Sequence, residues 1–524
     1  MSARGAPRLA LAALVVGAIA VLAYDALLST YRYRYSGDSA SYIDMAQNLL
    51  RDGRPYVTPW DVEPGDRDAV PQPLFPPGLP VLIAALTPLA GDVRVAALWP
   101  GPVAAALLPL LVVWLFRGAV ADAVLGGVAA LVLVSPGVRD WHFLAYSDVP
   151  ALALAVLALG ALARGLGLGV APATAAARWL AAAGLAAGAA YAVRNAGLAV
   201  LAASVATLGY ARLRGLGDRR AMLAWLAGAA VPIVPLLAYN LVTFGRLQPY
   251  DMPRSTRRWT VNVADYALAQ LDELGFPAAL AAQPACAIIL VALIAMTLAA
   301  AFWRLRRAPA RQGLVVLLGG YSAAGALLLV ASRSRYEWGN FIDNRNVLQY
   351  TFAYALGLAV AADAVAGPRL KRAAAALGVV LLASLVVSAV KDSLAARAYH
   401  EETWLTLSRD RALMAAVRAL PPDALVASNT ALVFRIGVPR PVRELEVGGD
   451  DRDFRGSLGQ LARAAAGRRP AAFVLVCDEW TRQFSACGGP SAPPPALPTC
   501  QLLRSEWPRA FLCEVPAAGS APQP

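Results

Sequence analysis

Two carboxylates in this sequence, Asp38 and Asp148, have the type and setting of groups that move protons. Asp38 opens a short helical pattern, and Asp148 starts an apolar run in the motif Ser147-Asp148-Val149-Pro150. A carboxylate held beside a hydroxyl can accept its proton and make the oxygen a better nucleophile. Asp also caps helix N-termini, so a purely structural role stays open for both residues.

Cationic side chains that could bind an anionic substrate accompany these acids. They are Arg194, Arg246, Arg345 and His142. A guanidinium group binds phosphate oxygens in a bidentate manner, which suits a phosphate-bearing substrate. Arg194 and Arg345 could instead extend to lipid headgroups, and His142 could be an ordinary loop histidine. Tyr42 is a further substrate-binding candidate, with packing in an interfacial aromatic belt as the alternative.

The composition indicates a polytopic membrane protein. Of the 524 residues, 58% are hydrophobic and 15% are charged. Many uncharged runs of Ala, Leu and Val approach the length of about 20 residues that a membrane-spanning helix needs. The net charge of +13 could indicate nucleic-acid binding, but the arginines cluster between the apolar runs. Arg-rich cytoplasmic loops facing anionic lipid explain this better, so we expect membrane lipids and no nucleic acid as partners.

The apolar runs predict about eleven transmembrane helices. They fall at 9–29, 94–116, 120–136, 148–164, 178–193, 196–212, 221–243, 284–303, 312–331, 346–366 and 373–390. Alternation that places every Arg-rich loop inside puts the N-terminus in the cytoplasm and the C-terminal part outside. The first run is too long for a signal-peptide core, so we expect it to be retained as an anchor.

The stretch that carries Asp38 predicts a short amphipathic helix on the membrane surface. Apolar or small residues recur at helical spacing at positions 42, 45, 46, 49 and 50, and Gly53 with Pro55 behind it is typical of a helix end. We expect Asp38 to be the N-cap, with its carboxylate at the exposed tip of the helix.

Beyond residue 391 the pattern changes to a small extracytoplasmic α/β domain. Helices are expected near 401–420 and 454–467, and strands at 424–428, 442–447, 471–477 and 511–515. Four of the five cysteines fall here, at positions 477, 487, 500 and 513. Outside the cytoplasm they could form two disulfides in any of three pairings, and their spacing does not fit a zinc site.

The fold class is therefore mainly α, with about eleven transmembrane helices and a small C-terminal α/β domain. The expected domains are a transmembrane module at 1–391, which includes the first outside loop at 30–93, and the α/β domain at 392–515. A disordered tail is expected at 516–524.

Short motifs occur in an order that resembles a known superfamily. They are Asp38, Tyr42, Ala46, Leu49 and Gly53 in the first loop, Phe75 to Pro80, Ser147 to Pro150, Gly184 to Arg194, Tyr239 to Gly245, and the pair Ser428-Asn429. This order resembles the GT-C superfamily of polyprenyl-phosphate-sugar-dependent glycosyltransferases. The similar branch holds protein O-mannosyltransferases, the aminoarabinose transferase of lipid A and RgtA/B/C/D-like enzymes.

Two motifs differ from that pattern. Ser39 stands where many relatives have a second acid, and Arg345-Asn346-Val347-Leu348-Gln349 stands in place of an Arg-Tyr-x-x-Pro element. The first difference removes an acid beside Asp38. The second leaves Arg345 without the rest of the motif that accompanies this arginine in the superfamily.

The resemblance implies a glycosyltransferase that inverts the anomeric carbon. It would transfer a sugar from a polyprenyl-phosphate donor to a lipid, polysaccharide or protein acceptor on the outer face of the bacterial cytoplasmic membrane. Asp38 would be the general base with Asp148 in support, and Arg194, with Arg246 or Arg345, would neutralise the departing phosphate. No cofactor is implied, and a divalent metal ion stays an open alternative.

Two other functions stay open. A transporter or flippase of lipid-linked saccharide would use the same charges to bind its cargo without chemistry. A catalytically silent scaffold would instead bind a partner through its α/β domain.

Overall fold

The computed structural model describes residues 34–59, 69–170, 176–250, 252–276, 283–337, 342–398, 402–438, 440–445, 451–465, 470–477, 487, 500–506 and 508–515. The chain divides into two compact units. Unit 1 contains Pro73–Gly91 and Val95–Ala395, and unit 2 contains Ser29–Gln72, Asp92–Arg94 and Ala396–Pro524. The first long loop is thus divided between the two units. The boundaries predicted at residues 391 and 515 stay predictions.

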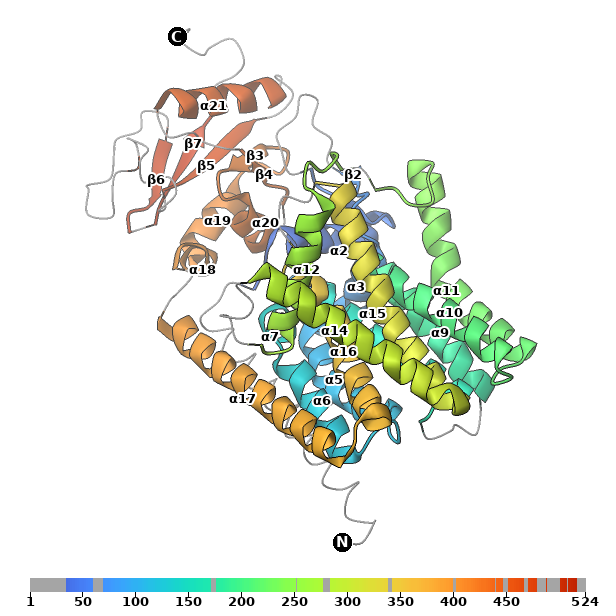
Figure 1. Cartoon of the computed structure of the whole chain (residues 1–524). Coiled ribbons are helices and arrows are strands. Elements are labelled where there is room, and N and C mark those ends of the chain that lie inside the picture. Colours follow the sequence, from blue (N-terminus) through green and yellow to red (C-terminus); the bar gives the residue numbers. More distant parts are fainter. Residues whose placement is uncertain are drawn as a thin grey trace. The chain divides into compact units, whose positions relative to one another are not determined.

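Unit 1 is a bundle of helices (Figure 1). Within the described residues, nine helices are long and apolar enough to cross a membrane. They contain α5 (Pro100–Leu115), α8 (Asp148–Leu166), α9 (Ala176–Val193), α10 (Leu198–Leu213), α11 (Arg219–Phe244), α14 (Pro284–Arg304), α15 (Pro309–Arg335), α16 (Asn344–Val365) and α17 (Pro368–Ala398). The mainly helical, multi-pass class predicted from the composition is confirmed.

Two of the eleven predicted spans have no counterpart among these long helices. The run at 120–136 forms a shorter apolar helix, α6 (Asp122–Val134), and the run at 9–29 lies outside the described residues. A further short apolar helix, α3 (Gly78–Ala90), follows the Phe75 to Pro80 motif.

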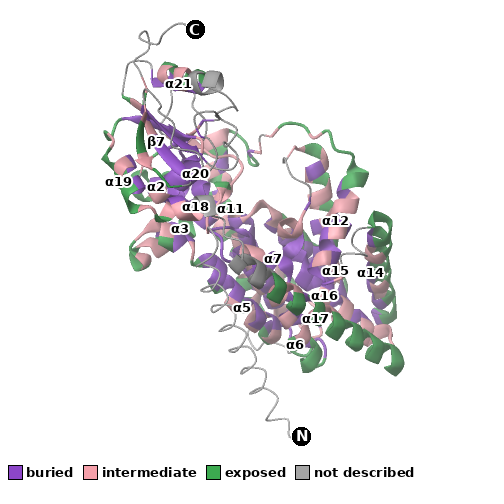
Figure 2. Cartoon of the chain, turned by 90° about the vertical axis from the view of Figure 1, so that its left-hand side faces the viewer, coloured by how far each residue is buried: buried purple, intermediate pink, exposed green. Residues whose placement is uncertain are grey.

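Two spanning helices, α8 and α16, form the centre of the bundle. Of their apolar stretches, 72% in α8 and 67% in α16 are buried inside the protein, against 6% in α17. Figure 2 colours the described residues by burial, with buried residues in purple and exposed residues in green. Asp148 is the first residue of α8, and Arg345 is the second residue of α16. The two candidate site residues therefore stand at the N-terminal ends of the two most buried spans.

Glycines let α9 and α11 approach closely. A Cβ atom added to Gly184 would lie 2.0 Å from the Trp225 carbonyl oxygen, and one added to Gly228 would lie 2.0 Å from the Ala181 carbonyl oxygen. Small residues at helix contacts are typical of membrane bundles, where packing rather than water drives association. This contact fixes α9, whose last residue Val193 directly precedes Arg194.

Two helices outside the candidate spans lie near the ends of α8 and α16. They are α7 (Pro136–Trp141) and α12 (Trp259–Glu273), and both pack against α16. Helix α12 was not predicted, although Gly275 (φ +84°) just beyond it is a common helix-end signal.

Unit 2 contains a mixed five-stranded sheet in the order β4-β3-β5-β7-β6. The parallel strands are β4 (Arg443–Glu444), β3 (Leu425–Ser428) and β5 (Ala471–Cys477), and β7 (Arg509–Glu514) is antiparallel to both β5 and β6 (Cys500–Arg504). Helix α21 (Asp451–Ala465) lies along one face of this sheet (Figure 1). The predicted C-terminal α/β domain is confirmed, whereas β6 was not predicted.

The two disulfides settle a pairing that the sequence left open. They join Cys477 to Cys487 and Cys500 to Cys513. The second bond links residues that are direct partners in the β6–β7 register. Cys286, in α14, is free and exposed.

The helix that carries Asp38, α2 (Gly37–Asp52), packs in unit 2 with the C-terminal part of the chain. Its buried residues include Tyr42 and Asp44, and it contacts α20 (Ala431–Gly437). The Asp44 carboxylate accepts from the backbone N–H of Thr58 at 3.2 Å and forms a buried ion pair with Arg435 of α20. The first loop and the C-terminal domain are therefore joined by a charged contact.

Candidate active site

The centre of the candidate site is Asp148, held between two arginines. The Asp148 side chain is fully buried. Arg194 Nη2 lies 2.8 Å from its Oδ1 atom, and Arg345 Nε donates to its Oδ2 atom at 3.1 Å. The side chains of Arg194 and Arg345 are 21% and 19% exposed. One carboxylate thus orients two partly exposed guanidinium groups, an arrangement suited to an anion with more than one oxygen.

Aromatic rings complete the surroundings of Arg345. Its guanidinium carbon lies 3.9 Å from the ring centre of Tyr146 and 5.5 Å from that of Trp141. The two rings stack at 5.4 Å between centres. A cation over an aromatic face is attracted by the ring quadrupole, so the rings restrict where Arg345 can point.

The Phe75 to Pro80 motif and the end of α9 position Arg194. A Cβ atom added to Gly78 would lie 2.4 Å from the Ala192 carbonyl oxygen, so only glycine allows this approach of α3 to α9. Asn195 Nδ2 donates to the Leu74 carbonyl at 3.3 Å. Arg194 Nη1 also donates to Ser147 Oγ at 3.2 Å. Three motifs that are far apart in the sequence therefore meet at Arg194.

Asp38 lies in unit 2, and its predicted capping role is wrong. The N-cap of α2 is Ser36, whose Oγ accepts from the backbone N–H of Ser39 at 3.4 Å. Ser39 Oγ accepts from the backbone N–H of Ser36 at 3.1 Å, which completes a capping box. Asp38 occupies the first turn instead and is partly exposed. The predicted C-terminal end at Gly53, with φ of +70°, is confirmed.

Of the other predicted substrate-binding residues, two are buried and one is exposed. Tyr42 is 1% exposed within the core of unit 2. His142 is 2% exposed, with Nδ1 at 2.9 Å from the Val138 carbonyl oxygen, as expected of a histidine that packs within a loop. Arg246 is exposed in the turn after α11. The structure thus brings together Asp148, Arg194 and Arg345 in unit 1, whereas Asp38 and Tyr42 belong to unit 2.

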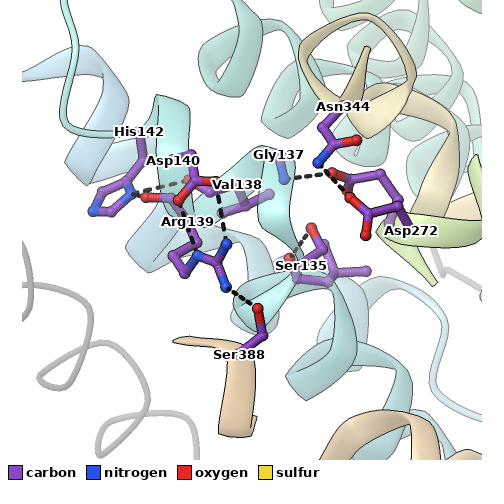
Figure 3. A network of polar contacts seen from close by, with 11 residues as sticks. Ser135, Gly137, Val138, Arg139, Asp140, His142, Asp272, Asn344 and Ser388 are labelled. Atoms are coloured by element: carbon purple, nitrogen blue, oxygen red, sulfur yellow. Dashed lines mark hydrogen bonds and ion pairs between the residues drawn. The ribbon is translucent and has the colours of Figure 1, made fainter. Parts of the chain in front are cut away.

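Sequence reasoning missed a second acidic group close to this site, at the C-terminal end of α12. Glu273 is fully buried, and its carboxyl group accepts from the backbone N–H of Gly137. Asp272 Oδ2 accepts from Asn344 Nδ2 at 2.6 Å (Figure 3). Helix α12 is not one of the candidate membrane spans. The pKa of Glu273 is raised to about 8, chiefly because the carboxyl group is buried. Two adjacent acids at a helix end usually face solvent, so the sequence carried no signal of this burial.

A metal centre is not evident among the described residues. No group of three or more His, Cys, Asp or Glu side chains in that part of the chain is arranged to hold a metal ion. The described part of the candidate site is therefore one of paired arginines and carboxyl groups.

Comparison with solved structures identifies the fold. The chain is similar to ArnT from Cupriavidus metallidurans bound to undecaprenyl phosphate, with a TM-score of 0.56 and 14% identity over 100% of both chains. It is also similar to the oligosaccharyltransferase AglB from Archaeoglobus fulgidus in complex with an inhibitory peptide and a dolichol-phosphate. That TM-score is 0.52, with 13% identity over 89% of this chain and 69% of AglB.

A third similar structure is the arabinofuranosyltransferase AftD from Mycobacteria, with a TM-score of 0.51 and 16% identity over 97% of this chain and 40% of AftD. No family model and no curated protein sequence matches the chain. The chain is a multi-pass membrane protein with the GT-C fold. At these identities the similarity establishes the fold alone.

Proposed function

We propose that this protein is a membrane glycosyltransferase that takes its sugar from a polyprenyl-phosphate donor. The observation that carries the proposal is the Asp148 carboxylate paired with Arg194 at 2.8 Å and Arg345 at 3.1 Å. Two oriented guanidinium groups at the ends of buried helices match the charge and shape of a phosphate. The ArnT structure that shares this fold is bound to undecaprenyl phosphate, which supports the same ligand class here.

The proposed reaction is a direct displacement with inversion. An acceptor hydroxyl oxygen attacks the anomeric carbon of the donor while the bond from that carbon to the phosphate oxygen breaks. The bonding electrons leave on the phosphate, and the acceptor proton passes to Asp38, the proposed general base. Arg194 and Arg345 stabilise the charge that develops on the departing phosphate, with Arg246 as a further contact. Asp148 holds both guanidinium groups in place.

The proposed location is the outer face of a bacterial cytoplasmic membrane, with the N-terminus in the cytoplasm. The two disulfides of unit 2 support an oxidising compartment for the C-terminal part. The acceptor is a lipid, polysaccharide or protein; a peptide-bound structure of AglB is among the similar folds. The transferred sugar is a hexose or a pentose.

The test uses purified protein in lipid vesicles with a panel of polyprenyl-phosphate sugars and a crude acceptor fraction. Chromatography of the lipid products should reveal free polyprenyl phosphate, and Asp38→Asn should slow its release on the order of a hundredfold or more. A transporter or flippase would bind or move the donor and leave its glycosidic bond intact. Intact donor across the whole panel, in vesicles whose protein binds polyprenyl phosphate, would favour that second function and refute the transferase.

A further inference from the structure

The acidic pair at the end of α12, Asp272 and Glu273, connects the two elements that hold Arg345. We propose that Asp272 and Glu273 are positioning residues that keep the Arg345 guanidinium group against the Asp148 carboxylate. The inference rests on the proposed transferase function for its kinetic test. Its structural part stands without that function. Neither residue touches the Arg345 guanidinium directly, so both would act through the backbone segments that they anchor.

The first anchored element is α7. Glu273 accepts from the Gly137 backbone N–H at the start of α7. A Cβ atom added to Gly137 would lie 2.4 Å from Leu348 Cβ and 2.7 Å from Glu273 Oε1. Because only glycine fits between α12 and α16 at this point, the carboxyl group reaches the α7 backbone directly.

The second anchored element is the first turn of α16. Asp272 Oδ2 accepts from Asn344 Nδ2 at 2.6 Å, and Asn344 is the residue directly before Arg345 (Figure 3). About two turns further along α16, Thr351 Oγ1 donates to Glu273 Oε2 at 3.5 Å. The residues on either side of Arg345 in α16 are therefore held by the same helix end that contacts α7.

Both α7 and α16, the two elements that α12 contacts, help to place the guanidinium group of Arg345. Helix α7 ends at Trp141, whose ring stacks with Tyr146, and both rings lie beside the Arg345 guanidinium. Loss of the α12 contacts would free both the backbone and the aromatic side of Arg345. The expected result is a guanidinium group that no longer keeps its place against Asp148.

The α7 segment has another support that does not involve α12. The Arg139 guanidinium pairs with Asp140 at 2.9 Å and donates to Ser388 Oγ of α17 at 3.4 Å (Figure 3). Removal of the Glu273 contact should therefore loosen the first turn of α7 without unfolding the segment. We therefore expect the Glu273→Ala protein to fold and to differ from the wild type at the candidate site.

The test compares Glu273→Ala with Glu273→Gln in the full-length protein. Gln keeps an oxygen that can accept from Gly137 and resembles the protonated acid, whereas Ala leaves the N–H buried without an acceptor. Asp265→Asn is the matched control, because it removes a carboxylate from the same helix in a partly exposed ion pair with Arg257. Hydrogen–deuterium exchange of residues 135–148 and 344–351 reports the anchoring without any reaction.

We expect faster exchange in both segments for Glu273→Ala only. With donor and acceptor present, Glu273→Ala should lower kcat on the order of tenfold to a hundredfold, as small misplacements of catalytic groups do. The KM for the donor should change less, and Glu273→Gln should restore kcat. Unchanged exchange in a folded Glu273→Ala protein would overturn the inference, as would a normal kcat. Changed exchange in a protein that never cleaves the donor would instead refute the proposed function and leave the anchoring intact.

Discussion

Arg435 of the C-terminal domain and Asp44 of α2 form a buried ion pair between residues that are 391 positions apart. The Arg435 side chain is 2% exposed, and its Nη2 atom also donates to the Thr58 carbonyl at 2.8 Å. Asp44 stands on the same helix as Asp38. The proposed base is therefore carried on a helix that the C-terminal domain holds by charge as well as by packing.

Removal of this pair from one side should destabilise unit 2. Arg435→Ala leaves the Asp44 carboxylate buried without its cation, a change that typically costs about 3–5 kcal/mol. Arg435→Ala combined with Asp44→Ala should cost less than the sum of the two single changes. Thermal unfolding of the four proteins in a double-mutant cycle measures this coupling. Additive losses would mean that the pair is not a coupled contact.

The role of Asp38 can be separated from the stability of α2, because Ser36 is the cap. Asp38→Asn should leave thermal stability nearly unchanged and slow transfer on the order of a hundredfold or more through loss of the base. Ser36→Ala should lower stability by about 1 kcal/mol and retain turnover. Turnover rates and thermal unfolding of both variants separate the role of Asp38 in transfer from the role of Ser36 in stability. Near-normal turnover in Asp38→Asn would exclude Asp38 as the base.

Turnover should depend on the planar guanidinium group of Arg345 and not only on its positive charge. Arg345→Lys keeps a cation but loses the Nε contact to Asp148 and the stacking over Tyr146. We expect turnover to fall on the order of tenfold or more, and we expect binding of polyprenyl phosphate to weaken. Arg306→Lys, at an exposed position in unit 1, is the control and should behave as the wild type. An Arg345→Lys protein with normal turnover would show that a point charge is sufficient.

Stability should fall with rising pH through the titration of Glu273. Its pKa is raised from 4.5 to about 8 as the net result of several causes. Burial is the largest and raises the pKa, polar contacts with Ser135 and the Gly137 N–H lower it, and the nearby charges of Asp272 and Asp140 raise it. Arg139, bound to Asp140, is the cation on the facing helix. The folded protein keeps this proton more tightly than the unfolded chain. Its stabilising effect is therefore complete below pH 4.5 and is lost as the pH rises to about 8.

Glu273→Gln removes this titration while keeping the side-chain oxygen. Between pH 6 and pH 8 the wild-type protein should lose up to about 1.4 kcal/mol per pH unit more than the variant. Thermal unfolding of both proteins across this range measures the difference. Parallel curves for the two proteins would mean that Glu273 is ionised in the folded state throughout.

Thiol chemistry should distinguish one cysteine from the other four. Cys477, Cys487, Cys500 and Cys513 are bonded, and Cys286 is free and exposed. Protein denatured without reductant should therefore bind one equivalent of a thiol reagent, and reduced protein should bind five. Each disulfide of this kind stabilises a small domain by typically about 2–4 kcal/mol. Five reactive thiols before reduction would contradict both disulfides.

Periodicity predicted most of this fold because its signals are local. Apolar runs marked nearly every span in the described part of the chain, and Gly53 marked the end of α2. The start of α2 was misplaced because Ser36 and Asp38 are both good caps and stand two residues apart. A choice between them depends on which side chain reaches Ser39, and composition does not encode that geometry.

The site was predictable as a set of residues but not as a set of contacts. Charges near membrane depth singled out Asp148, Arg194 and Arg345. The pairing of Asp148 with Arg345 joins residues that are 197 positions apart, and no local pattern encodes it. Glu273 escaped notice because its burial comes from α7 and α16, which pack over a helix end that resembles exposed surface.

The contact between Asp44 and Arg435 also sets an order of events during synthesis. A chain that grows at about 5–20 residues per second needs roughly 20–80 s to lengthen from the first residue to the second. During that interval α2 has been made, but the guanidinium group that neutralises Asp44 has not. The helix that carries Asp38 can thus pack early against β1 (Tyr56–Val57), which follows it directly, and gains its contact with α20 only late in synthesis. A chain truncated before Arg435 should contain every arginine of the candidate site and still lack the ion pair that holds α2, the helix of the proposed base.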